Sequence, residues 1–179
     1  VLFRSVTIHR ATRDKPTTVG SHCMLMVNSH VGHDCLIGNH VTLVNGALLA
    51  GHVQLFDNVI ISGNACVHQF CRLGRYAILS GVEGVNKDVP PFCMVYHTRL
   101  IGALNRVGLR RAGLRAHITP LQKAFDILYR RNLPNTTAAN LILTDLGHDP
   151  LCKEFAEFVL SSTRGMSQYV AKQAFMKGR

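Results

Sequence analysis

The chain has 179 residues, of which 47% are hydrophobic and 17% are charged, and it contains no Trp. This composition fits one globular domain, with or without an appendage, and it excludes a disordered chain. The stretch from Cys35 to Phe56 lacks Lys, Arg, Asp and Glu but is interrupted by polar residues, so we expect no integral membrane segment. The chain begins without Met and without a signal-peptide pattern, and we expect it to be a fragment.

The six cysteines show no C-x-x-C spacing, and several occupy positions where a small buried side chain is wanted. We therefore expect buried free thiols, which suit a reducing compartment, and a cytoplasmic location. The cysteines are Cys23, Cys35, Cys66, Cys71, Cys93 and Cys152.

The net charge of +10 is concentrated in the second half of the chain. Up to Tyr96 there are seven Lys and Arg against five Asp and Glu, whereas from His97 there are thirteen against five. An anionic partner should therefore meet the C-terminal part. Nucleic acid is not expected, because no aromatic stacking platform or base-reading motif accompanies the arginines.

An uninterrupted six-residue repeat runs through the first half. Its aliphatic positions are Val19, Leu25, Val31, Ile37, Leu43, Leu49, Leu55, Ile61, Val67, Leu73, Leu79 and Val85. Two positions before them lie small or β-branched residues, namely Cys23, Ser29, Cys35, Val41, Ala47, Val53, Val59, Ala65, Cys71 and Ala77. This period fits neither an amphipathic helix nor a simple strand and predicts a parallel β-helix over residues 1–91.

In such a coil each hexad forms one side of a triangle, so residues eighteen apart stack on successive rungs about 4.8 Å apart. Gly, Asn, Asp and His are frequent at the turn positions, where tight or left-handed backbone is required. Hexad coils of this kind are known to wind left-handed, against the usual crossover rule. The expected fold is therefore an all-β left-handed parallel β-helix.

The repeat should end near Pro90-Pro91, because consecutive prolines remove ladder donors. Residues 92–179 should form a small α-helical domain with a basic segment. Helix starts are predicted at Thr119-Pro120 and at Asp149-Pro150, and another helix is predicted from Asn135 to Leu146.

Several histidines fall inside the repeat, and their columns are predictable from eighteen-residue stacking. His33 shares a column with Gly51 and Gln69, and Asp34 shares the next column with His52. A histidine beside a carboxylate, with a glycine N–H one rung away, forms a plausible general-base site.

Three alternatives stay open at this point. Each histidine alone could be a solvated turn residue. Imidazoles from adjacent coils could bind zinc, as in the trimeric β-helix hydratases of the carbonic anhydrase type. The coil could also be a noncatalytic structural element.

Seven ordered motifs carry a resemblance to a known family. They are V-T-I-H-R at 6–10, N-S-H-V-G-H-D-C at 28–35, L-A-G-H at 49–52, V-H-Q-F at 67–70, K-D-V-P-P at 87–91, N-R-V-G-L-R-R at 105–111 and S-T-R-G at 162–165. Together they resemble the acyl-[acyl-carrier-protein]:UDP-N-acetylglucosamine O-acyltransferases, the first enzymes of lipid A synthesis. The likeness covers about residues 6–165.

The resemblance implies a homotrimer that transfers a 3-hydroxyacyl group from acyl carrier protein to the 3-hydroxyl of UDP-N-acetylglucosamine, with no cofactor and no metal. It implies that His33 is the catalytic base, that Asp34 supports it and that the Gly51 N–H binds the oxyanion. The implied substrate contacts are His30, His52, His68 and Gln69, and the implied nucleotide contacts are Asn105 and Arg111. Gly81 matches the position that limits the acyl chain, although it could simply satisfy a turn, since Gly51 and Gly63 share its hexad position.

The chain also departs from the family pattern. The family has further coils on the N-terminal side, including residues that grip substrate. Val107 and Ala112 also stand where the family often has an acidic residue and a second arginine. The charge distribution predicts that an acidic carrier protein meets the basic residues Arg99, Arg106, Arg110, Arg111 and Arg115.

Overall fold

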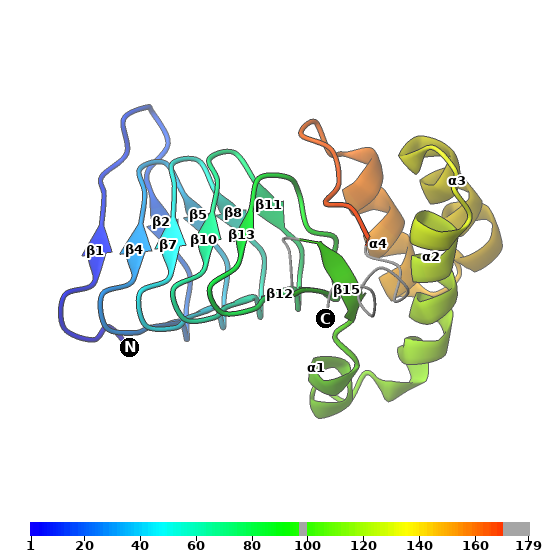
Figure 1. Cartoon of the computed structure of the whole chain (residues 1–179), viewed down its shortest axis with the longest axis horizontal. Coiled ribbons are helices and arrows are strands. Elements are labelled where there is room, and N and C mark those ends of the chain that lie inside the picture. The colour runs from blue at the N-terminus through cyan, green and yellow to red at the C-terminus, as the bar shows by residue number, and fades with distance from the viewer. Residues whose placement is uncertain (97–99, 170–179) are drawn as a thin grey trace, which may run out of the picture.

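The protein consists of a triangular coil of short strands with a group of helices at its C-terminal end (Figure 1). The computed structural model describes residues 1–96 and 100–169. Within these ranges, none of the helices is both long and apolar enough to cross a membrane. The parallel β-helix and the helical region predicted from the sequence are both confirmed.

Three sheets form the sides of the coil, and neighbouring strands in each are parallel except for the last pair. The β1 sheet contains β1 (Thr7–Ile8), β4 (His30–Val31), β7 (Leu48–Leu49), β10 (Cys66–Val67) and β13 (Gly84–Val85). The β2 sheet contains β2 (Thr18–Val19), β5 (Leu36–Ile37), β8 (Gln54–Leu55) and β11 (Arg72–Leu73). The β3 sheet contains β3 (Met24–Leu25), β6 (Thr42–Leu43), β9 (Ile60–Ile61), β12 (Ile78–Leu79), β14 (Cys93–Val95) and β15 (Ile101–Leu104).

The register confirms the eighteen-residue rung. His30 pairs with Leu48, and Cys66 pairs with Gly84, so each strand sits on the strand one full turn earlier. In the two-residue strands of the coil the second residue points inward, and residues such as Leu43 and Ile61 are completely buried. Each such side chain contributes roughly 1.5–3 kcal/mol of hydrophobic stabilisation before chain entropy is subtracted.

From β2 to β13, one residue at every corner between successive strands has a left-handed backbone, and this requirement explains which residue types are frequent at the corners. Asn, Asp and Gly tolerate this conformation best, whereas a β-branched residue such as Val82 is strained in it. The positions are His22, Asn28, Asp34, His40, Gly46, His52, Asn58, Asn64, Phe70, Tyr76 and Val82.

Burial departs from the pattern of the repeat at Val19, and the expected burial of the cysteines needs one correction. Val19 is only partly buried, because it lies near the open N-terminal end of the coil. All six cysteines are free thiols, but Cys66 is exposed and not buried. Cys66 directly precedes the inward Val67 in β10, and successive side chains of a strand point to opposite faces.

The sheet continues beyond the two prolines at which the repeat ends. β14 pairs in parallel with β12, and β15 returns antiparallel to β14. Ile78 pairs with Met94, so this last turn is sixteen residues long and the six-residue period is lost. The division of the chain into domains at residue 91 stays a prediction.

The helical region contains α1 (Arg106–Arg111), α2 (Ile118–Arg130), α3 (Asn135–Leu146) and α4 (Pro150–Leu160). The predicted starts of α3 and α4 are confirmed, and Asp149 caps α4, whereas α2 begins at Ile118, two residues before the predicted first residue Pro120. The sequence did not predict α1, which has only six residues.

Helix α4 docks directly on the β2 sheet. The guanidinium carbon of Arg72 lies 4.5 Å from the ring centre of Phe158, and Arg75 forms an ion pair with Glu154. The same Phe158 ring meets Phe56 edge-on at 5.7 Å. These contacts fix the helical region, and the segment that follows it, against the last turns of the coil.

Candidate active site

The candidate catalytic pair lies on the turn between β4 and β5. His33 Nδ1 is 2.7 Å from Asp34 Oδ2, and the Asp34 backbone is left-handed with φ of 60°. The Asp34 side chain is 7% exposed, whereas that of His33 is 40% exposed. The carboxylate is therefore enclosed and the imidazole is accessible.

The segment between β1 and β2, which projects from the coil (Figure 1), holds the Asp34 carboxylate. Asp34 Oδ1 accepts from the backbone N–H groups of Thr12 and Arg13 at 3.0 and 3.2 Å, and Oδ2 accepts from the Thr12 hydroxyl at 2.6 Å. The Asp34 N–H in turn donates to Thr17 Oγ1 at 2.8 Å.

These bonds settle the proton positions on the pair. The hydrogen bonds from Thr12 and then from His33 hold the pKa of Asp34 far below its usual value, so this side chain is an acceptor-only carboxylate. His33 Nδ1 must then carry the hydrogen of the 2.7 Å bond, which leaves Nε2 as the free lone pair. The arrangement is that of an oriented general base.

Gly51 lies one rung above His33, as the stacking predicts. A Cβ on Gly51 would lie 2.5 Å from both Cε1 and Nε2 of the His33 ring, closer than real Cβ atoms approach. The Gly51 backbone is not left-handed, so the ring contact and not the turn excludes a side chain here. Among backbone hydrogen bonds of the described residues, none uses the Gly51 N–H as donor.

His52 completes this corner from the same rung as Gly51. Its ring meets His33 edge-on at 5.1 Å and stacks on Phe70 at 4.5 Å, and its Nε2 is 3.8 Å from Asp34 Oδ2. One ligand atom each from His33, Asp34 and His52 lies within 4.8 Å of the others, as the metal-dependent alternative requires. A metal would have to displace hydrogen bonds that both Asp34 oxygens already accept, so these residues fit the general-base interpretation better.

The three remaining predicted substrate contacts surround this corner. His30 precedes it on β4 and bonds Thr7 Oγ1 through Nδ1 at 2.7 Å; burial and then the neighbouring His9 lower its pKa. His68 and Gln69 are exposed on the next rung. His68 Nδ1 lies 2.9 Å from the Arg164 guanidinium.

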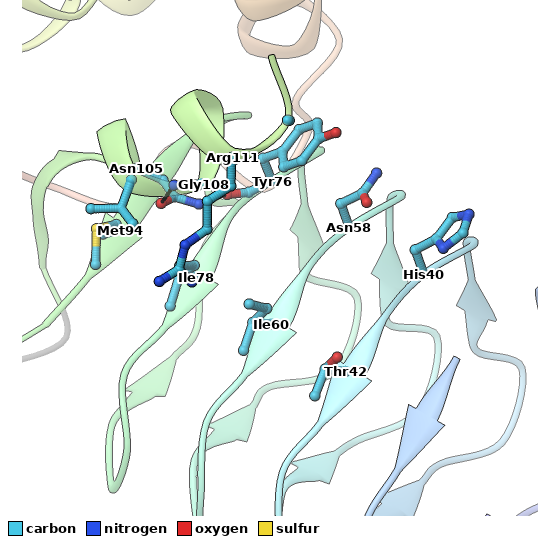
Figure 2. A pocket seen from close by; sticks show the side chains of 12 residues that line it. His40, Thr42, Asn58, Ile60, Tyr76, Ile78, Met94, Asn105, Gly108 and Arg111 are labelled. Carbon is cyan, nitrogen blue, oxygen red and sulfur yellow. Dashed lines mark hydrogen bonds between the residues drawn. The ribbon is translucent and has the colours of Figure 1, made fainter. Parts of the chain in front are cut away.

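The predicted nucleotide contacts lie in a different place, over the outer face of the β3 sheet (Figure 2). Asn105, the residue before α1, and Arg111, its last residue, line a hollow of about 560 Å³. Outward residues of the sheet form its floor, and the turn residues His40, Asn58 and Tyr76 form its edge.

Asn105 is 3% exposed and has a positioning role in this chain. Its Oδ1 accepts from the Gly108 N–H at 2.8 Å and caps α1, while its Nδ2 donates to the Tyr76 carbonyl at 2.9 Å. Asn105 thus ties α1 to the coil, and Arg111 is presented above the hollow. The side chains of Arg106, Arg110 and Arg115 are exposed nearby, and Arg99 lies outside the described residues.

Gly81 lies on another corner, between β12 and β13. A Cβ there would meet the Gly63 carbonyl oxygen at 3.3 Å and no side chain within 4 Å. The Gly81 backbone is not left-handed, so turn geometry does not require glycine at this position. Glycine at position 81 therefore matters for the space that it leaves beside the coil, and not for backbone strain.

Sequence reasoning missed the residues that hold the histidines. Thr12 and Thr17 lie in or beside a segment that interrupts the repeat, and no period places them. Arg164 belongs to the S-T-R-G motif, but nothing in its spacing predicts contact with a residue ninety-six positions earlier.

The fold agrees with what known proteins show. The family described as "Udp N-acetylglucosamine O-acyltransferase; Domain 2" matches residues 88–167, and "Bacterial transferase hexapeptide (six repeats)" matches residues 16–51. An acyl-[acyl-carrier-protein]--UDP-N-acetylglucosamine O-acyltransferase of Pseudomonas putida F1 is 37% identical over 172 residues, which are 94% of this chain and 67% of the relative. The chain belongs to this acyltransferase family.

Other acyltransferases of the family extend the comparison. A relative of the same name from Anaeromyxobacter sp. Fw109-5 is 44% identical over 154 residues, which are 85% of this chain and 60% of the relative. The UDP-N-acetylglucosamine acyltransferase structures of Francisella novicida and Arabidopsis superpose with TM-scores of 0.83 and 0.88, at 32% and 29% identity. They cover 94% and 93% of this chain but 63% and 62% of those chains. The chain thus spans about three fifths to two thirds of the length of these relatives.

Proposed function

We propose that the chain carries the transfer site of an acyl-[acyl-carrier-protein]:UDP-N-acetylglucosamine O-acyltransferase, which catalyses the first step of lipid A synthesis. The observation that carries this proposal is the His33 imidazole, with Nδ1 bound to the Asp34 carboxylate and Nε2 beside Gly51. The names of the relatives supply the two substrates.

In the proposed reaction, His33 Nε2 removes the proton of the glucosamine 3-hydroxyl as its oxygen attacks the thioester carbonyl carbon of a 3-hydroxyacyl group. Asp34 stabilises the imidazolium that results. The Gly51 N–H donates to the oxyanion of the tetrahedral intermediate. As that intermediate collapses, the carbon–sulfur bond breaks and the carrier thiol leaves with the proton from His33, so no cofactor is needed.

The catalytic pair and the hollow predicted to bind the nucleotide lie apart on one coil, and this arrangement favours a homotrimer. His33 lies at the corner between the β1 and β2 sheets, whereas Arg111 lies over the β3 sheet. The two groups belong to different faces of one coil, so a site that contains both requires a second copy of the chain. The outward residues Met24, Ile60, Ile78 and Met94 give the β3 face the apolar character of an interface.

We further propose that acyl carrier protein docks on the basic residues around α1, because the coil from Pro16 to Cys71 has no Lys or Arg. The charge reversal Arg110→Glu with Arg115→Glu tests this docking surface. Weaker binding of the carrier, most evident at low salt, is expected. Unchanged affinity would contradict this docking surface.

Acyl transfer from 3-hydroxyacyl carrier proteins to UDP-N-acetylglucosamine tests the function directly. His33→Ala should lower the rate by about 10²–10⁴-fold, the usual contribution of a general base. His22→Ala is the matched control, because His22 is another exposed histidine of the coil that stacks on His40, away from Asp34. Equal rates for the two variants would contradict the proposal, and stoichiometric zinc bound through His33 and His52 would favour the hydratase alternative.

A further inference from the structure

The segment after α4 brings Arg164 to the coil, where it contacts His68. Arg164 Nη2 lies 2.9 Å from His68 Nδ1, and Arg164 Nε donates to the Asn86 carbonyl at 2.7 Å. Because a guanidinium has donors only and keeps its proton, His68 Nδ1 must be the acceptor. The ring hydrogen of His68 is then on Nε2.

A competing contact does not change this assignment. The Gln69 carbonyl oxygen lies 3.3 Å from His68 Nδ1 and would need that nitrogen to donate. The nitrogen cannot donate to the carbonyl in the neutral ring while it accepts from Arg164. The shorter, charge-assisted bond from Arg164 is the stronger one.

Arg164 is held in place by its own segment. The Ser162 hydroxyl donates to Asp88 Oδ2 at 2.8 Å, the Gly165 N–H donates to Ser162 Oγ at 3.0 Å, and the Asp88 N–H donates to the Gly165 carbonyl at 2.9 Å. Asp88 is 1% exposed, and it also accepts from Arg72. The backbone on both sides of Arg164 is therefore anchored on the coil before any substrate binds.

The contrast with His33 shows what this contact does. The carboxylate of Asp34 accepts from His33 Nδ1 and leaves Nε2 as a base, whereas the guanidinium of Arg164 donates to His68 Nδ1 and leaves Nε2–H as a donor. Opposite partners thus give two exposed histidines of one corner opposite roles. His68 also lines a hollow of about 440 Å³ whose other side chains are mainly small or apolar, including Ala50 and Val85.

We propose that Arg164 is a positioning residue that fixes His68 in the Nε2–H tautomer, so that His68 donates a hydrogen bond to an oxygen of the bound substrate and does not act as a base. This inference rests on the proposed acyl transfer for its functional part. The tautomer itself can be measured without any activity.

The first experiment measures the imidazole nitrogen shifts of His68 by NMR in the chain as it stands, at a pH above the range in which histidines protonate. We expect a protonated Nε2 and an unprotonated Nδ1, and we expect Arg164→Met to give a mixture of tautomers. Arg131→Met, which removes another exposed arginine just after α2, should leave the His68 signals unchanged. A protonated Nδ1, or signals insensitive to Arg164→Met in a folded chain, would overturn the proposal.

The second experiment is a double-mutant cycle on acyl transfer. Arg164→Met should lower kcat/KM roughly three- to tenfold, the effect of about one hydrogen bond, and should have no further effect in a His68→Ala chain. His68→Gln, which keeps an N–H donor, should retain more activity than His68→Glu, which offers only acceptors. Additive effects, or equal activity of the Gln and Glu variants, would overturn the donor role.

The two experiments separate the two proposals. Absence of acyl transfer in the unsubstituted chain would count against the proposed function, while the NMR measurement would still decide whether Arg164 sets the tautomer of His68.

Discussion

The coil and the helical region bury their side chains by different rules. In the coil, each two-residue strand gives one side chain to the core and one to the surface, as in Leu48–Leu49, where only the second is buried. In α2 the buried residues follow a helical stripe that includes Leu121, Phe125 and Leu128. The coil therefore presents a regular array of outward positions that its own core does not use, and His30 is one of them.

The helical region contributes to the sites mainly through its connecting segments. Asn105 immediately precedes α1, and Arg164 follows α4. Packing of the helices against the coil positions these connecting segments. The stacked residues of the coil carry the reactive side chains. This contrast can be tested by substitutions in the core of each region. Further tests change an outward position of the coil, a strained corner of the coil and a carboxylate in each region.

The largest effect on stability is expected from cavities. Ile61→Ala and Ile142→Ala each remove a completely buried side chain, one from the middle of the coil and one from α3. Each should lower the free energy of unfolding by about 2–5 kcal/mol in denaturant titrations. Hydrogen exchange should show lost protection on the rungs around Ile61 in the first variant and in α3 and α4 in the second. The same pattern in both variants would mean that the two regions unfold as one unit.

A change at an outward position should alter selectivity and not stability. Gly81→Met adds a side chain where only the Gly63 carbonyl lies close, so the coil needs only a small adjustment. If Gly81 faces the end of the acyl chain, overpacking by about 1–3 kcal/mol should shift preference to a donor several carbons shorter. Competition between long and short 3-hydroxyacyl donors measures the ratio. An unchanged ratio in an active, folded variant would rule out Gly81 as the chain-length limit, and Gly63→Met controls for a Met elsewhere in the same column.

Relief of backbone strain should stabilise the coil alone. Val82 is 83% exposed and left-handed, with φ of 64°, which costs a β-branched residue about 1 kcal/mol or more. Val82→Asn should therefore raise the midpoint of thermal unfolding. The matched variant Val107→Asn, at an exposed valine of α1, should change stability by less than about 0.5 kcal/mol. An equal rise of the unfolding midpoint in both variants would show that solubility, and not relief of backbone strain, is responsible.

The smallest effect at neutral pH is expected from Asp149, which links η1 (Arg115–His117) to α4. Burial pushes the pKa of Asp149 up, but hydrogen bonds from His117, Cys152 and Leu151 outweigh it and the pKa is lowered overall. Its stabilisation is therefore complete above the unfolded pKa of about 3.9 and is lost as pH falls through the lower folded value. Asp149→Asn preserves an acceptor for the cap, so neutral-pH stability should change by about 1 kcal/mol or less.

Helical circular dichroism followed during acid titration measures this dependence. The Asn variant should lose less stability than the original chain as the solution becomes acidic. The Asp34 carboxylate, whose pKa is also lowered, should still impose its own acid dependence on the coil. A variant with unchanged acid sensitivity in its helices would show that Asp149 does not link the two elements.

The repeat determined the coil, its core and the neighbours of His33 without any structure. Counting eighteen residues from His33 leads to Gly51, and the contact between the ring and that glycine confirms the count. This works because each turn is a translation of the previous one, so spacing along the chain converts directly into position in space. Proline and N-cap residues located α2 and α4 in the sequence, because a helix start depends on residues that are close together in the chain.

Only the tertiary structure decided what each histidine can do. The proton position on His33 depends on Asp34, which the interrupting segment around Thr12 holds, and that on His68 depends on Arg164. The structure likewise decided that Asn105 caps α1 and that Arg111 lies over a different face from His33. None of these contacts is set by the six-residue period, because they join the repeat to segments outside it, whose places depend on how the helices and loops pack against the coil.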